Sequence, residues 1–475
     1  MKIARLFRRL SDRPRRVAIA LALVVSGIAV AGDPIADSES FTTRETGTQA
    51  YSVTVAAIPE HLRQSISSGR RMFQEPWVLP TQYTGVWGIG PTFNENSCPA
   101  CHENNGRARA PGSRGEIAAG LILRLSVPAN DGAPQPHPHY GDQFQNRGVK
   151  GQVPAEGKAL VRYESLDVKF ADGERISLRK PIVEFTELAF GPLAKDTMVS
   201  ARVAPSLAGL GLLEAIPEET LLQIAKQQPA QGLNGKPNYV WDVEAKQLVL
   251  GRFGWKANQP SLRQQIAAAF HADIGATSSL YPAENCPDIQ TECLKGPSAT
   301  GCSGGRGKCD GEIFWEVLPS RLRNVTLYLQ ALAVPAQREA NDPTVRQGEK
   351  LFADAQCAGC HLPELKTGTV TAIPAAASLS IRPYTDLLLH DMGDGLADGR
   401  PDFLANGSQW RTAPLWGLGL QKTVNAHTDF LHDGRARNLV EAIVWHGGEA
   451  QSSRDRFLAM NKREREALLK FLESL

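Results

Sequence analysis

Two short motifs, one near each end of the chain, have the residue types and spacing that attach a porphyrin to a protein. Both read Cys-x-x-Cys-His, and their chemistry-bearing residues are Cys98, Cys101, His102, Cys357, Cys360 and His361. In this pattern two thiols add across the vinyl groups of a haem, and the histidine that follows is placed to ligate the iron. With 8 Cys and 10 His among 475 residues, chance would supply only about 0.003 copies of the motif. We therefore expect two covalently bound c-type haems (iron), with zinc sites or redox dithiols as the alternatives.

The first 31 residues have the three-part plan of an export signal. A basic segment, MKIARLFRRLSDRPRR, precedes the apolar run VAIALALVVSGIAVAG, in which Ala29 and Ala31 form an A-x-A site before Gly32. The run is short for a membrane span. We expect a signal peptide over residues 1–31, with an uncleaved membrane anchor as the alternative. Either outcome predicts a periplasmic protein, in the compartment where bacteria attach c-type haem.

The remaining cysteines lie together in a polar, glycine-rich segment. They are Cys286, Cys293, Cys302 and Cys309. None has an adjacent histidine, so a second metal centre is the weaker interpretation. In an exported chain four such thiols predict two disulfides, and the three possible connectivities stay open.

The charge and composition of the chain restrict the classes of partner that we expect. The formal net charge is only +2, and the basic leader supplies more than that. The chain also lacks a basic stripe with interleaved aromatic residues, so no nucleic-acid partner is expected. No later segment is long and apolar enough to span a membrane, which leaves the leader as the only expected membrane contact.

Internal repeats indicate the elements that must position the two motifs. SSGRRMF (67–73) precedes the first motif and VRQGEKLF (345–352) precedes the second, each with helical character. ARVAPSLAGLGLLEAIPEETL (201–221) resembles WRTAPLWGLGL (410–420) joined to FLHDGRARNLVEAI (430–443). We predict a mainly α fold with two cytochrome-c-like haem domains, residues 55–335 and 340–475. Inserted β-hairpins, one turning at Asp172-Gly173, and the disulfide-bearing loop enlarge the first domain.

The second half offers a further iron ligand. One apolar helical face is formed by Leu439, Ala442, Ile443 and His446. A histidine on a buried face needs a partner, and a haem iron needs a sixth ligand, so we predict His446 in that role. The alternatives are His432, His427, His390 and Met392. Ligation by Met392 would give a haem of higher potential.

These motifs together resemble the bacterial di-haem cytochrome c peroxidase superfamily. The resemblance is closest to its di-haem oxidoreductase branch, some members of which are labelled thiol oxidoreductases. It rests on RVAPSLAGLGLLEAIPEETL, GRFGWKANQPSLRQQIAAAF, PYTDLLLHDMGDGLADG and FLHDGRARNLVEAIVWHGGEA, and it runs from about Gly69 to Leu475. It implies one haem that collects electrons and a second that reduces peroxide. The family usually has a Met ligand 14 residues after the H-D-G turn, but that step from His432 reaches His446 here.

The resemblance also implies an acid–base group beside the reactive haem, because peroxide cleavage moves a proton between oxygens. Glu214 occupies the matching repeat position, with Glu184 and Glu187 as alternatives; Glu214 could instead charge a helix start. An aromatic bridge between haems is expected from Trp255, Trp410 or Trp416, each of which could also be core packing. His137 and His139 are alternative ligands of the first haem, although a Pro-rich loop favours exposure.

Four aspartates could hold Ca²⁺ but lack the EF-hand pattern, so a calcium site is not claimed; they are Asp391, Asp394, Asp398 and Asp402.

The expected function is that of an exported di-haem oxidoreductase enzyme of the cytochrome c peroxidase type. Electrons would come from a small redox protein or another donor and pass between the haems. Peroxide, or another small oxidant, would be reduced at the N-terminal haem. The alternatives are an electron-transfer cytochrome with no substrate of its own, and an oxygenase or protein-modifying relative.

Overall fold

The fold is taken from a computed structural model, which describes residues 39–79, 85–112, 114–117, 119–129, 134–296, 308–309, 312–313, 315–369 and 371–475. The predicted signal peptide and Cys302 lie outside these residues. Within them, no helix has the length and apolar character that crossing a membrane requires.

The longer helices lie mostly around the two haem motifs and at the C-terminus. They are α2 (Glu60–Gln74), α5 (Glu218–Gln227), α6 (Leu262–Asp273), α8 (Pro319–Gln330), α9 (Pro343–Asp354), α12 (Gln451–Ala459) and α13 (Lys462–Ser474). The short ones are α3 (Cys98–Cys101), α4 (Leu210–Glu214), α7 (Thr291–Leu294), α10 (Gln421–Asn425) and α11 (Leu439–Val444). Single 3-10 turns are η1 (Glu39–Phe41), η2 (Glu103–Asn105), η3 (Gln228–Gln231), η4 (Cys357–Gly359), η5 (Pro374–Ala376), η6 (Leu418–Leu420) and η7 (Gly448–Ala450).

The strands form many small sheets. One sheet has the order β10 (Arg175–Thr186), β9 (Lys158–Lys169), β5 (Arg114–Glu116), and another β11 (Met198–Val203), β6 (Leu121–Pro128), β7 (Pro134–Gln135). Two-stranded pairs join β1 (Thr42–Thr43) with β16 (Val334–Pro335), β2 (Trp77–Val78) with β3 (Val86–Trp87), β4 (Thr92–Phe93) with β8 (Arg147–Gly148) and β12 (Tyr239–Asp242) with β13 (Gln247–Leu250). The other pairs are β14 (Lys308–Cys309) with β15 (Glu312–Ile313), β17 (Leu365–Lys366) with β18 (Ser380–Ile381), and β19 (Leu389–Asp391) with β20 (Gln409–Arg411).

The prediction of a mainly α fold is therefore wrong. Helix accounts for 32% of the structure and strand for 21%. Many strands are only two or three residues long, which is too short to show the alternation that identifies a strand in sequence. Their pairing is set by partners far along the chain, as for Thr42 with Val334.

The helices that precede the two motifs pack in the same way. Gly69 of α2 meets α8, where a Cβ on Gly69 would lie 1.9 Å from the Asn324 carbonyl oxygen. Gly348 of α9 meets α13, where a Cβ would lie 2.0 Å from the Ala467 carbonyl oxygen. The repeated glycine thus lets each helix approach its neighbour closely. Asp342 begins α9 by accepting hydrogen bonds from the Thr344 and Val345 N–H groups.

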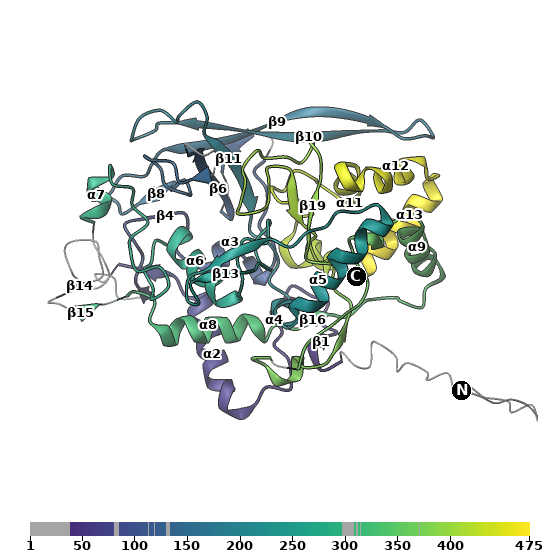
Figure 1. Ribbon diagram of the computed structural model, residues 1–475, viewed down its shortest axis with the longest axis horizontal. Coiled ribbons are helices and arrows are strands. Elements are labelled where there is room, and N and C mark those ends of the chain that lie inside the picture. Colours follow the sequence, from purple (N-terminus) through teal and green to yellow (C-terminus); the bar gives the residue numbers. More distant parts are fainter. Residues whose placement is uncertain are drawn as a thin grey trace, which may run out of the picture.

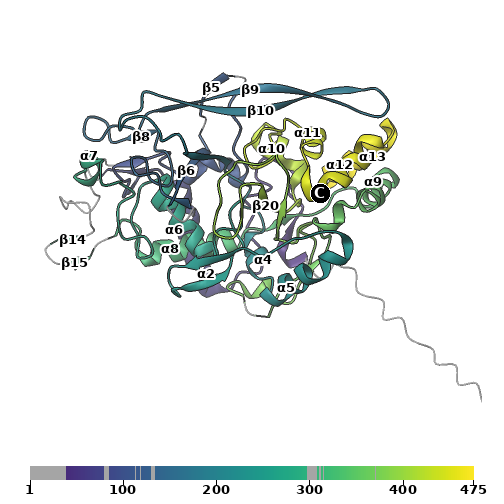
Figure 2. The same ribbon diagram turned by 45° about the horizontal axis from the view of Figure 1, so that its top comes forward.

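A long hairpin crosses the molecule above both halves. Strands β9 and β10 lie along the top in Figure 1 and reach from the small sheets of the N-terminal half to the yellow C-terminal helices. At its tip, the Ala171 N–H donates to the Leu458 carbonyl at 3.0 Å. The Phe170 ring lies 6.0 Å from that of Phe457. The predicted turn at Asp172 thus lies against the C-terminal half, as the second view also shows (Figure 2).

The hydrophobic cores cross the predicted domain boundary. The larger one is built mainly from the N-terminal half but includes Leu365, Ile373 and Ile381. The second contains most of the C-terminal helices together with Phe170 and Leu178 of the hairpin. The two halves therefore share buried surface, and the domain limits stay a prediction.

Candidate functional site

The first motif forms a single helical turn that presents its histidine. Within α3, the His102 N–H donates to the Cys98 carbonyl at 2.8 Å, so both thiols and the imidazole lie on one turn. The His102 Nδ1 lies 2.8 Å from the Pro205 carbonyl oxygen. A carbonyl accepts only, so Nδ1 carries the proton and Nε2 keeps its lone pair. Burial lowers the pKa of His102 to about 4, which keeps the ring neutral.

The second motif repeats this arrangement on a 3-10 turn. The His361 N–H donates to the Cys357 carbonyl at 3.0 Å. The His361 Nδ1 lies 2.9 Å from the Tyr384 carbonyl oxygen. Burial lowers the pKa of His361 to about 4 as well. A neutral imidazole held through Nδ1 and free at Nε2 is the form that binds a metal, and the carbonyl fixes its orientation.

Burial raises the pKa of all four motif thiols. None of them is disulfide-bonded. Burial raises the pKa of Cys98 and of Cys357 to about 12. A redox dithiol needs a lowered thiol pKa, so the redox alternative has no support at either motif.

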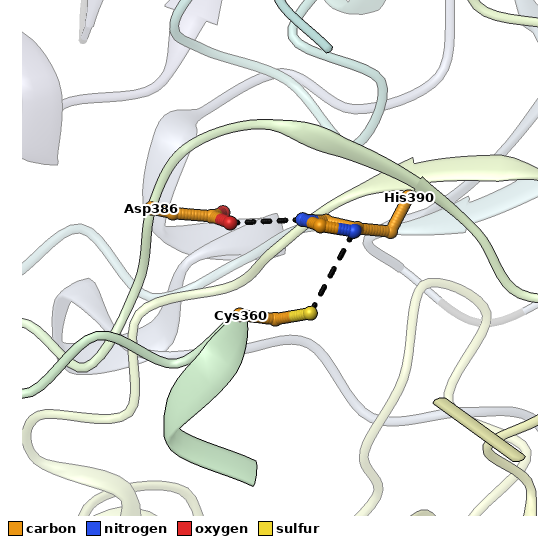
Figure 3. A group of neighbouring side chains, drawn as sticks. All are labelled: Cys360, Asp386 and His390. Atoms are coloured by element: carbon orange, nitrogen blue, oxygen red, sulfur yellow. Dashed lines mark hydrogen bonds and ion pairs between the residues drawn. The ribbon is translucent and has the colours of Figure 1, made fainter. Parts of the chain in front are cut away.

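One cluster beside the second motif has the spacing of a metal site. Cys360, Asp386 and His390 offer atoms within 4.8 Å of one another (Figure 3). However, the His390 Nε2 lies 2.8 Å from Asp386 Oδ2, and its Nδ1 lies 3.0 Å from Glu449 Oε2. Burial opposes the charge of His390, but the carboxylates prevail and raise its pKa to about 12. Both ring nitrogens thus face carboxylate oxygens, and these contacts hold the cluster together.

Each motif opens into its own cavity. The first, of about 300 Å³, is lined by Cys98, Cys101 and His102. The second, of about 810 Å³, is lined by Cys357, Cys360 and His361. Both volumes are typical of cofactor sites. Two thiols and one free imidazole Nε2 at each cavity form the donor set of a c-type haem, so the residues fit that group.

The two cavities are adjacent, because several residues line both. They are Arg107, Trp255, Arg411, Ala413, Pro414 and Leu418. The Trp255 Nε1 donates to the Val203 carbonyl at 2.8 Å, which fixes the ring in this shared wall.

A comparison with known protein families shows to which family the chain belongs. Residues 39–475 match a family model described as "Di-haem oxidoreductase, putative peroxidase". The chain belongs to this family. It is an oxidoreductase, and haem is its cofactor.

The other comparisons add little. The search of curated proteins found no match for this di-haem oxidoreductase. A solved structure of Kuenenia stuttgartiensis hydrazine synthase, pressurised with xenon at 20 bar, aligns over 98% of this chain and 100% of that one. Identity is 12% and the TM-score is 0.33, which is too weak a likeness to support any argument.

The second cavity of the di-haem oxidoreductase holds another histidine fixed in the same manner. The His446 Nδ1 lies 2.7 Å from the Ala442 carbonyl oxygen, and burial lowers its pKa. The face predicted from sequence, Leu439, Ala442, Ile443 and His446, lines the cavity throughout. Of the alternative ligands, His390, Met392 and His432 also line it, whereas His427 does not. His432 is stacked on Trp410, with 3.7 Å between ring centroids.

The first cavity is different. Of the described residues that line it, His102 is the single histidine and there is no methionine. Its polar lining groups include Glu95, Arg124, Gln143 and Asp273. The Gln143 Nε2 donates to Asp273 Oδ1 at 2.7 Å. Burial raises the pKa of Asp273 to about 6.

The predicted acid–base residue Glu214 lies elsewhere. Its Oε1 accepts from the Leu262 N–H at 2.8 Å, at the start of α6, and its Oε2 accepts from Gln330 Nε2 at 2.5 Å. It is not among the residues that line either cavity. Glu184 and Glu187 do not line them either and pair with Arg162 and Lys158. The catalytic role of Glu214 stays a prediction.

Three of the other predicted groups can be located. Cys286 and Cys293 form a disulfide, while the remaining pair involves Cys302, outside the described residues. The expectation of exposure is wrong for His137, which is 2% exposed because its loop folds inward. Among the described residues, the four candidate calcium aspartates do not form a group with metal-ligand spacing.

Several important groups had no signal in the sequence. The carbonyls of Pro205 and Tyr384 act through the backbone, which any residue type supplies. Glu449 and Asp386 meet His390 from positions 59 and 4 residues away. Arg107 follows the first motif closely, but its position in a wall between two cavities depends on tertiary packing.

Proposed function

We propose that this di-haem oxidoreductase is an exported c-type cytochrome that acts as a peroxidase. Substrate is reduced at the N-terminal site, with electrons from the C-terminal site. The observation that supports this assignment is the asymmetry of the cavities. The second contains a neutral His446 in addition to His361, whereas the first offers His102 alone among its described lining residues.

The chain supplies matching anchors for two cofactors. Cys98 and Cys101 would form the thioether links of one haem, with His102 as its iron ligand. Cys357, Cys360 and His361 would hold the other, with His446 as a further ligand to its iron. When bound, the haems would supply one-electron transfer and, where the chain provides one iron ligand only, a site for a small oxidant.

Electron transfer would use the wall between the cavities. Trp255 lines both, and its hydrogen bond to Val203 holds it in place. Trp410 lines only the second cavity and Trp416 only the first. Trp255 is therefore the favoured bridge of the three. Electrons would enter from a small redox protein or another periplasmic donor.

Proton transfer needs a group that reaches the first cavity. Asp273 lines this cavity. General acid–base catalysis is most efficient when the pKa of the group lies near the working pH, and the pKa of Asp273 is raised to about 6. Gln143 holds one of its oxygens and leaves the other to exchange a proton. Glu214, the residue predicted from sequence, does not line the cavity, and both of its oxygens accept hydrogen bonds, one from the Leu262 N–H and one from Gln330 Nε2. Asp273 is therefore proposed as the acid–base group in place of Glu214.

One pair of variants tests this choice. Asp273→Asn should slow peroxide-driven oxidation of the reduced protein by about 10²–10⁴-fold, the usual contribution of acid–base catalysis. Glu214→Gln is the matched variant and should retain the rate with both haems bound. The reverse result would return the role to Glu214.

The function itself is tested on the wild-type protein. An EPR spectrum of the isolated holoprotein should contain a high-spin component from the open iron. Stopped-flow mixing with hydrogen peroxide should oxidise the reduced protein much faster than a six-coordinate cytochrome. Two low-spin haems and slow oxidation would instead identify an electron carrier. N-terminal sequencing of the periplasmic fraction tests export, with Gly32 as the expected first residue.

A further inference from the structure

Arg107 lies in the wall that separates the two cavities, and two of its guanidinium nitrogens lack a partner in the described part of the chain. It lines both cavities. Its Nε and Nη2 are inaccessible to solvent and have no hydrogen-bond partner among the described residues. A buried charge without a partner costs several kcal/mol, by a rough general estimate. Natural structures therefore seldom keep one unless another group completes the site.

The nearest acids are already occupied. Asp429 Oδ1 accepts from Arg179 Nη2 at 2.8 Å, and its Oδ2 accepts from the Ala110 N–H at 3.1 Å. Asp433 is bound by Arg435 through distances of 2.7 and 2.8 Å. Burial lowers the pKa of Arg107 to about 10. The negative charges of Asp429 and Asp433 offset only part of that shift.

The remaining contacts fix the position of Arg107 without neutralising it. Its backbone N–H donates to Asn425 Oδ1 at 3.1 Å, and its carbonyl lies 2.9 Å from His427 Nε2. The guanidinium carbon lies 5.0 Å from the centre of the Trp255 ring. An aromatic face attracts a cation but accepts none of its in-plane N–H bonds. A planar anion such as a carboxylate would accept hydrogen bonds from two N–H groups of the guanidinium at once.

We infer that Arg107 is a shared counter-ion for haem propionates, binding a carboxylate of the cofactor in each cavity. This inference rests on the proposed di-haem function. Thioether links would hold the vinyl groups of each haem at its cysteines, and the carboxylates would be the polar groups still to be matched. A guanidinium that faces both cavities would raise both reduction potentials, because a positive charge stabilises the reduced form.

The test compares two neighbouring arginines in the holoprotein. Arg107→Gln should lower the potentials of both haems in a spectroelectrochemical titration. We expect each equilibrium to move by about tenfold, or 59 mV for one electron. Arg109 is the matched control, because it is exposed and its Nη2 donates to the Ala426 carbonyl. Arg109→Gln should leave both potentials within about threefold of the wild-type equilibrium, by the same conversion.

A second variant covers the case in which Arg107→Gln does not fold. Arg107→Lys keeps the charge but loses the planar fork, so the potentials should stay near wild type while the carboxylate bands of the redox infrared difference spectrum shift. Unchanged bands would overturn the inference. So would a potential shift confined to one haem, or equal shifts in the Arg109 control.

The outcomes separate this inference from the function on which it rests. A holoprotein with both potentials lowered but no reaction with peroxide keeps Arg107 as the counter-ion and rejects the peroxidase. A protein that reacts with peroxide but whose potentials do not change in Arg107→Gln keeps the peroxidase function and rejects Arg107 as the counter-ion. A chain that carries no haem overturns both.

Discussion

At the scale of single residues, three histidines share the same hydrogen-bonding arrangement. His102, His361 and His446 each have Nδ1 against a backbone carbonyl, which fixes one tautomer and leaves Nε2 free. The backbone supplies the partner, so the orientation does not depend on a second side chain. Burial keeps these rings neutral, and a neutral ring is ready to ligate iron without first losing a proton.

The His446→Ala variant tests the proposed sixth ligand. Loss of the imidazole should convert the C-terminal haem from low spin to high spin, as seen by EPR at low temperature. Met392→Leu is the matched control, since Met392 lines the same cavity. Its low-spin signal should persist. Loss of the signal in the Met392 variant alone would assign the ligand to that residue.

A buried carboxyl predicts part of the pH dependence of stability. Glu156 accepts bonds from the Gln145 N–H at 2.5 Å and from Gln290 Nε2 at 2.6 Å, and burial raises its pKa from 4.5 to about 8. Between these values the folded protein holds a proton that the unfolded chain releases, so stability falls as pH rises. The slope should approach about 1.4 kcal/mol per pH unit.

Thermal or urea unfolding across pH 5 to 8 measures this slope. Glu156→Gln should flatten it, while exposed Glu292→Gln should retain it. An unchanged slope in the Glu156 variant would show that other groups govern the dependence.

At the scale of elements, helix pairs and one hairpin hold the motifs in place. Helices α2 and α9 precede the two motifs and use a glycine to approach α8 and α13. The β9–β10 hairpin then joins the halves, since Arg179 on β10 donates to the Gly434 and Arg435 carbonyls at 2.9 Å. The site is thus positioned by contacts between elements distant in sequence.

The Gly348→Ala variant tests the close helix contact. Helix propensity alone would stabilise the variant by about 1 kcal/mol. The added Cβ would lie 2.0 Å from the Ala467 carbonyl oxygen, so α9 and α13 must separate. Overpacking of this kind costs about 1–3 kcal/mol, and we expect net destabilisation in urea unfolding. Gly115→Ala, where a Cβ meets nothing within 4 Å, should not be destabilised comparably; equal losses would contradict the packing argument.

At the scale of the whole molecule, two cavities share one wall. Trp255 and Arg107 lie in that wall, so the two cavities are separated by side chains that belong to neither motif. The hairpin above and the C-terminal helices beside it hold the two halves together (Figures 1 and 2). The proposed electron transfer between the two sites would depend on this separation.

Covalent loading is the prediction that concerns the whole chain. Denatured mature protein should retain two haems, measured by intact mass and by haem staining of a gel. Cys98→Ala with Cys101→Ala should remove one haem, and the equivalent change at Cys357 and Cys360 should remove the other. An apo-protein mass, or zinc in place of iron, would contradict the proposed c-type linkage.

The sequence by itself determined the chemistry that is local. A Cys-x-x-Cys-His motif is complete within five residues, and one helical turn places its thiols and imidazole together. The face that carries His446 was also readable, because a helical period depends only on neighbouring positions. The glycines at Gly69 and Gly348 were visible as a repeat, although their purpose was not.

Only the tertiary structure decided which groups meet across the chain. Glu214 matched a repeat position, yet its oxygens bind the start of α6 and Gln330. Asp273 and Arg107 gave no signal, because a residue's place beside a cavity depends on every element that encloses it. The two-residue strands were equally invisible, since Thr42 becomes a strand only through Val334. Local periodicity encodes a turn or a helix face, whereas burial and partner choice are properties of the packed chain.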